Sequence, residues 1–127
     1  MSTAVQDLVA WQQAMDLVEI VYKLTAKLPK EELYGLTSQM RRSAVSIASN
    51  MAEGQGRNSK GEFLQVLGNA RGSLEELRTQ VLIAQRLKFA VEPEIENVLK
   101  VLERVARLVN GLMQAVKPKV LRTAAGG

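Results

Sequence analysis

The sequence of 127 residues predicts an all-α fold, an antiparallel up-down-up-down four-helix bundle formed by a single domain. Three observations support this prediction. Apolar residues recur at spacings of three and four along four segments, short turn sequences separate those segments, and only five residues are aromatic, which disfavours a β-rich fold. The bundle should occupy residues 1–116, with helices at about 8–28, 36–54, 60–88 and 93–116, and residues 117–127 should form a disordered basic tail.

The first predicted helix carries two adjacent apolar stripes. One consists of Ala14, Leu17, Val21, Leu24 and Leu28, and the other of Trp11, Met15, Val18, Tyr22 and Thr25. Two stripes are more than one edge of a monomeric bundle needs. Either the helix is deeply buried in a small core, or, as we favour, the second stripe packs against a neighbouring subunit. Pro29 should end the helix, because proline disfavours helical geometry at the residue before it.

The second predicted helix has one apolar side and one polar side. The apolar side contains Leu36, Met40, Ala44, Ile47 and Met51, and the polar row contains Gln39, Arg42, Ser46, Ser49, Asn50 and Glu53. Short hydroxyl and amide side chains between an arginine and a glutamate favour a hydrogen-bonded network between helices. A contact with a nucleic-acid backbone or a protein partner is a second interpretation, and an anion-stabilising catalytic site is a third, weaker one. Gly54 and Gly56 should end the helix in the left-handed C-cap conformation.

The third predicted helix begins with a capping box, in which Ser59 precedes Glu62 by three residues. Its apolar seam consists of Phe63, Leu67, Ala70, Leu74, Leu77, Val81 and Ala84. Gly68 and Gly72 lie four residues apart inside this helix, and each costs about 1 kcal/mol relative to alanine. We therefore expect another helix backbone to approach closely at these two positions.

The fourth predicted helix starts near Pro93, which suits the first helical position. Its seam consists of Ile95, Val98, Leu102, Val105, Val109, Leu112 and Val116. Lys100, Arg104 and Arg107 lie on the opposite, outer face and form a basic stripe.

Composition excludes several kinds of site. The chain has no cysteine and no histidine, which removes disulfides, thiolate metal ligands, the commonest metal ligand and the usual acid/base at neutral pH. No apolar run is long enough to span a membrane, and the N-terminus lacks the pattern of a signal peptide. We expect a cytoplasmic, non-enzymatic protein without a metal or cofactor.

Charge is distributed unevenly along the chain. Residues 37–71 carry five basic and two acidic groups, and residues 100–127 carry six basic and one acidic group, whereas residues 1–36 and 72–99 are each net acidic. Such segments either keep a protein soluble or bind phosphates. The expected nucleic-acid-binding residues are Arg41, Arg42, Arg57, Lys60, Arg71, Lys100, Arg104 and Arg107. Lys117, Lys119 and Arg122 would extend the second basic zone.

One stretch of the second helix also resembles a known family. The sequence Leu33-Tyr34-Gly35-Leu36-Thr37-Ser38-Gln39-Met40-Arg41-Arg42, followed by Ser46-Ile47, Ser49-Asn50 and Ala52-Glu53-Gly54, is similar to bacterial 23S ribosomal RNA intervening-sequence proteins. This four-helix-bundle family is related to the accessory variability determinant of diversity-generating retroelements. The similarity runs from Val9 to about Leu87 and weakens beyond. The family commonly has proline where this chain has Ala48, so we expect a straighter helix here.

The resemblance implies a ring-shaped homo-oligomer, typically a pentamer, that associates with structured RNA or DNA, a reverse transcriptase or a ribosomal partner. With the charge pattern, it predicts an oligomeric accessory protein that binds the nucleic-acid backbone. The alternative is a scaffolding oligomer that binds a protein partner and no nucleic acid.

Overall fold

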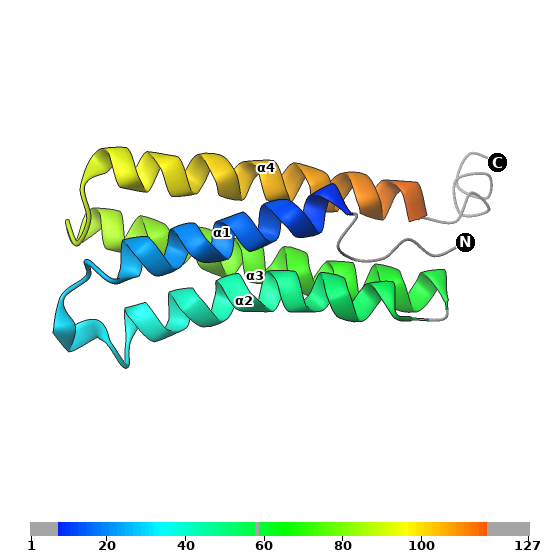
Figure 1. Cartoon of the computed structure of the whole chain (residues 1–127), viewed down its shortest axis with the longest axis horizontal. Coiled ribbons are helices and arrows are strands. Elements are labelled where there is room, and N and C mark those ends of the chain that lie inside the picture. The colour runs from blue at the N-terminus through cyan, green and yellow to red at the C-terminus, as the bar shows by residue number, and fades with distance from the viewer. Residues whose placement is uncertain (1–7, 58, 117–127) are drawn as a thin grey trace.

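A computed structural model describes residues 8–57 and 59–116 of the chain. Within them lie α1 (Val9–Thr25), the 3₁₀ segment η2 (Lys30–Glu32), α2 (Leu36–Gln55), α3 (Lys60–Arg86) and α4 (Glu92–Val116). These residues contain no strand, so the all-α prediction is confirmed for them. Figure 1 shows the four α-helices side by side, with the α1–α2 and α3–α4 connections at one end and the α2–α3 connection at the other. The predicted tail at 117–127 lies outside the described residues.

Each α-helix packs against the next one in sequence, and α1 also packs against α4. In the described part of the chain, α2 makes no close backbone contact with α4, and α1 makes none with α3. The helices therefore occupy the four corners of a square in cross-section. Consequently, the outer faces of α2 and α4 point to opposite sides of the molecule.

The core is built from the predicted seams. Its largest fully buried side chains come from all four helices and are Leu17, Val21, Leu24, Met40, Ile47, Met51, Leu67, Leu74, Leu77, Val81, Ile95 and Leu102. Burying one such side chain contributes about 1.5–3 kcal/mol to stability, so these residues dominate the energetics of the fold. The seam residues nearest the α2–α3 end, Phe63, Leu112 and Val116, are only half-buried.

The two stripes of α1 differ in exposure. The first is buried along its whole length, whereas Met15 and Tyr22 of the second remain 38% and 43% exposed. Thr25, predicted in the second stripe, is instead 2% exposed, and its hydroxyl donates to the Val21 carbonyl at 2.8 Å. The helix also ends at Thr25 rather than near Leu28, because the amide of Leu28 bonds three residues back to the Thr25 carbonyl in a tightened last turn before proline.

Gly54 serves packing rather than capping. The helix continues through it to Gln55, Gly56 caps it with φ −86°, and no described glycine has a positive φ, so the expected left-handed caps are wrong. Gly54 is buried, and a Cβ there would lie 2.7 Å from a ring carbon of Phe63 on α3. The absence of a side chain therefore lets α3 approach α2 at this point.

Gly68 and Gly72 do not mark a close helix contact within the chain. A Cβ added at either position meets nothing within 4 Å among the described residues. The expectation of a tight approach is wrong for the single chain, because these positions face outwards from α3.

The start of α3 follows the sequence prediction, and its end does not. Ser59 Oγ accepts from the Glu62 amide at 3.1 Å, which confirms the cap. At the other end Lys88 adopts φ 59°, the Phe89 amide bonds to the Ala84 carbonyl at 2.9 Å, and the Lys88 amide bonds to the Gln85 carbonyl at 3.0 Å. This pair of bonds is a Schellman motif, and it ends α3 two residues before the predicted boundary.

Every pair of packed helices shares a polar contact. The four pairs, with their donor–acceptor distances, are Arg41–Thr25 (2.8 Å, α2–α1), Ser46–Ser73 (2.9 Å, α2–α3), Arg78–Glu103 (2.7 Å, α3–α4) and Arg104–Gln13 (3.1 Å, α4–α1). Arg78 also pairs with Glu75 on its own helix, and the hydrogen bond that it donates to that carboxylate, more than the one that it donates to Glu103, raises the pKa of Arg78 above its ordinary value. The two contacts of α2 are partly buried, and the two contacts of α4 lie at the exposed edges of their interfaces.

Candidate nucleic-acid interface

The outer face of α4 presents the predicted basic stripe to solvent. Lys100, Arg104 and Arg107 are all exposed, while the opposite side of the helix is buried. Arg104 donates to the Gln13 side chain, and none of the three pairs with a carboxylate in the part of the chain described. Their charges therefore remain available to an external anion.

Arg71 belongs with this α4 face rather than with α2. It lies seven residues before Arg78, so the two side chains share one side of α3. Arg78 reaches Glu103 on α4. The sequence analysis grouped Arg71 with the α2 arginines because these residues are close in the sequence. Its position on α3 instead places it on the side of that helix that faces α4.

The remaining predicted basic residues divide into two places. Arg41 and Arg42 lie in the first half of α2, whereas Arg57 and Lys60 flank the α2–α3 turn. Arg57 Nη2 lies 2.6 Å from Glu53 Oε2, an ion pair one helical turn apart that offsets its charge. Within the described residues, Arg42 and Lys60 form no such pair.

The predicted polar row of α2 separates into a buried part and a solvated part. Ser46 shares a 2.9 Å hydrogen bond with Ser73 of α3, and Asn50 donates to the Ser46 carbonyl and hydroxyl at 2.8 and 3.0 Å. These three residues form the expected interhelical network. Gln39 and Ser49 are exposed, and Glu53 turns to Arg57 instead.

Ser73 is a network member that the sequence reading missed. It is buried in the α2–α3 interface, between the apolar seam residues Ala70 and Leu74. A serine next to an apolar seam and opposite a serine-rich helix is the pattern that could have indicated it.

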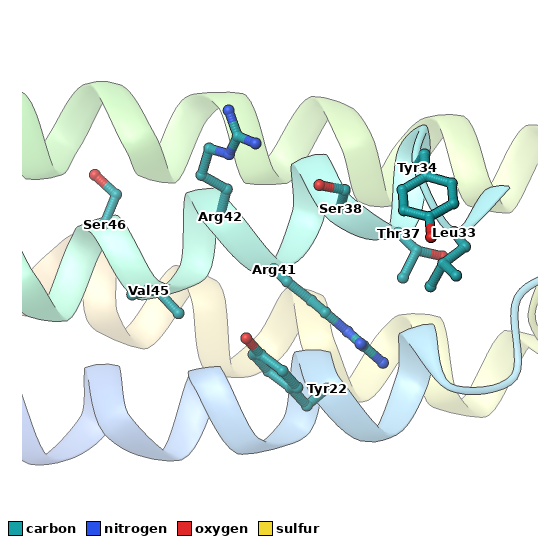
Figure 2. A pocket seen from close by; sticks show the side chains of 9 residues that line it. All are labelled: Tyr22, Leu33, Tyr34, Thr37, Ser38, Arg41, Arg42, Val45 and Ser46. Atoms are coloured by element: carbon teal, nitrogen blue, oxygen red, sulfur yellow. The ribbon is translucent and has the colours of Figure 1, made fainter.

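A surface hollow of about 600 Å³ lies over the outer side of α2 near the α1–α2 connection. Its lining residues are Tyr22, Leu33, Tyr34, Thr37, Ser38, Arg41, Arg42, Val45 and Ser46. Figure 2 shows Arg41 extending towards Tyr22 on α1, Arg42 extending towards α3, and Ser38 lying between Arg42 and Tyr34. The predicted basic residues of α2 thus border a hollow that also contains two tyrosines.

Among the residues described, no group of three histidine, cysteine, aspartate or glutamate side chains could hold a metal ion. No helix in that part of the chain has the length and apolar character needed to cross a bilayer.

Comparison with known proteins decides the family. Residues 6–111 match the family described as 23S rRNA-intervening sequence protein. The chain belongs to this family. The resemblance stated from the sequence is therefore confirmed.

A solved structure with a similar fold supports the architecture. It is described as a protein with unknown function from the S23 ribosomal protein family, from Bacteroides thetaiotaomicron VPI-5482. It aligns with a TM-score of 0.75 and 17% identity, covering 83% of this chain and 98% of the other. At this identity the comparison establishes the fold alone. A search of curated proteins finds no match.

Proposed function

We propose that this family member is a non-enzymatic accessory protein that binds the backbone of structured RNA or DNA. The observation that carries the proposal is the exposed stripe of Lys100, Arg104 and Arg107, which has no carboxylate partner in the described residues. Charges of this kind bind phosphates independently of sequence and release counterions, so the affinity falls steeply with salt. The family description, which refers to ribosomal RNA, supports a nucleic acid over another polyanion.

The same proposal includes assembly. We infer an antiparallel up-down-up-down bundle that forms a ring-shaped homo-oligomer, a pentamer by resemblance to the family, acting in the cytoplasm with a ribosomal or reverse-transcriptase partner. The partly exposed Met15 and Val18 of the second α1 stripe support the assembly, because the first stripe of that helix already fills the core. Several copies would multiply one weak basic stripe into useful avidity.

The test is binding of a labelled structured RNA, measured by fluorescence anisotropy from about 50 to 300 mM salt. The double variant Arg104→Glu with Arg107→Glu should weaken binding at least tenfold at low salt and lower the log–log salt slope by about two, because each lost phosphate contact removes about one unit. Lys23→Glu with Arg86→Glu is the matched control, since it makes the same charge change at exposed positions on α1 and α3. Absence of binding at low salt, or equal losses in both variants, would contradict the proposal.

A scaffolding function is the second candidate, and one observation favours it. Leu33, Leu87 and Val91 are exposed to 49%, 55% and 59%, and they lie in the connections that Figure 1 shows at one end of the bundle. Apolar side chains grouped at one end suit a protein partner. Retention of a partner protein after nuclease treatment, and its loss on Leu87→Asp, would favour this function.

A further inference from the structure

We propose that the hollow over α2 binds one unstacked nucleotide of a bound RNA or DNA, with its phosphate at Ser38, between the charges of Arg41 and Arg42, and its base on Tyr34. This inference rests on the proposed function and adds a second, structurally distinct contact to it. Two of the chain's five aromatic residues line this hollow together with two arginines.

The guanidinium of Arg41 is held in a fixed position by contacts with α1. Its Nε donates to Thr25 Oγ1 at 2.8 Å, and its guanidinium carbon lies 4.5 Å from the centre of the Tyr22 ring. Thr25 is itself buried and bonded to the Val21 carbonyl, so it anchors the arginine to α1. In the described residues no hydrogen bond uses the terminal nitrogens of Arg41, which leaves the two-pronged end of a fixed guanidinium for a phosphate.

Ser38 lies on the surface of α2 between the two arginines. It precedes Arg41 by three residues and Arg42 by four, so both arginines are its neighbours on the surface of α2. Figure 2 places the two guanidinium groups on opposite sides of that helix. A phosphate above Ser38 would therefore have a hydroxyl beneath it, with the Arg42 guanidinium on the α3 side of the helix and the Arg41 guanidinium further away on the α1 side.

Tyr34 supplies the surface for a base. It is 93% exposed, more than any other large hydrophobic residue among those described, although most tyrosines bury their ring. It precedes α2 at the end of the hollow next to Leu33. Every base has a flat face that stacks on such a ring, so the contact tolerates any sequence.

The size and composition of the hollow agree with this ligand. Its volume of about 600 Å³ falls within the range of sites for small ligands. Its lining combines aromatic and aliphatic side chains with two cations and no carboxylate. A base requires unstacking to enter, so the hollow should select loops and single-stranded segments over regular duplex.

The experiment compares a hairpin RNA carrying 2-aminopurine in its loop with a blunt duplex of equal charge. Tyr34→Ala should weaken hairpin binding about tenfold and remove the 2-aminopurine quenching caused by stacking, while duplex binding stays unchanged. Tyr34→Phe is the matched control, since it keeps the ring and should retain hairpin binding and quenching. The exposure of Tyr34 makes both variants compatible with folding.

Two outcomes would overturn the inference. The first is that Tyr34→Ala leaves both hairpin binding and 2-aminopurine quenching unchanged. The second is that a glutamate-rich peptide displaces the hairpin as effectively as unlabelled loop RNA does. The double variant Arg104→Glu with Arg107→Glu changes the charge of the α4 stripe and leaves the hollow over α2 unaltered, so it distinguishes the two contacts. If duplex binding depends on the α4 stripe but Tyr34→Ala has no effect, the nucleotide site fails and the proposed function stands. If the unaltered protein binds neither RNA, both fail.

Discussion

At the scale of single residues, the glycines of the bundle divide by what surrounds them. Gly54 is enclosed by Phe63 and Val66 of α3, whereas Gly72 faces open space. We expect Gly54→Ala to lower the free energy of unfolding by about 1–2 kcal/mol, because the added methyl group overlaps the Phe63 ring. Gly72→Ala is the control and should raise it by up to about 1 kcal/mol through helix propensity alone. Urea denaturation at one fixed protein concentration measures both.

A loss of stability in Gly72→Ala would contradict this expectation. It would mean that another copy of the chain covers the outer face of α3, which restores the close helix approach first expected from the sequence.

Lys88 occupies a backbone conformation that glycine adopts more easily. Its φ of 59° costs a residue with a Cβ about 1 kcal/mol or more. We expect Lys88→Gly to raise the free energy of unfolding by about 0.5–1 kcal/mol, since the Schellman bonds involve only backbone groups. Lys88→Ala removes the same charge but keeps the strain of the positive φ, so the midpoint of thermal denaturation should change little. Equal stabilisation by both variants would assign the effect to charge instead.

At the scale of elements, the α2–α3 interface contains a hydrogen bond between the side chains of Ser46 and Ser73. A double-mutant cycle of Ser46→Ala and Ser73→Ala should give a coupling of about 0.5–1.5 kcal/mol, typical of a neutral bond between partly buried groups. Ser49→Ala, at an exposed position of the same helix, should change stability by less than about 0.5 kcal/mol. A coupling near zero would show that water replaces the bond without cost.

The elements also show what the sequence could and could not predict. Heptad spacing located the four helices and their buried seams, because burial of an apolar stripe is a property of each helix alone. The end of α3 at a lysine was not predictable, since the left-handed residue there is not the usual glycine. The Arg41–Thr25 contact and the role of Ser73 depend on which residues of two different helices meet, and spacing within one helix carries no such information.

At the scale of the whole molecule, the two basic regions face opposite ways. The α2 arginines lie on one corner of the square and the α4 stripe on the diagonal corner, and the sequence alone gave no means to separate them. One nucleic-acid helix should therefore engage one region of a given subunit at a time. The salt slope measured on duplex should follow the α4 stripe alone.

Assembly should depend on the outer stripe of α1. We expect Met15→Glu with Val18→Glu to reduce the molecular mass in solution, measured by light scattering, towards that of one 14.0 kDa chain. Two carboxylates would have to lose their water in a closed interface, which costs far more than they regain there. Gln12→Glu with Asp16→Asn is a control on the exposed side of the same helix and should leave the mass unchanged. A single-chain mass for the unaltered protein would remove the assembly from the proposal.

The polar contact in each of the four helix interfaces has a consequence for alignment. Seams of leucine, valine and alanine repeat every seven residues, so sliding one helix along another by a repeat would bring similar side chains together again. The pairs Arg41–Thr25, Ser46–Ser73, Arg78–Glu103 and Arg104–Gln13 each occur at only one height along the bundle. A slipped helix would lose its contacts on both sides at once, and at the partly buried positions the hydroxyls of Thr25, Ser46 and Ser73 would lose these partners. The apolar seams hold the helices together, and these four polar pairs favour one alignment of the helices along the bundle axis.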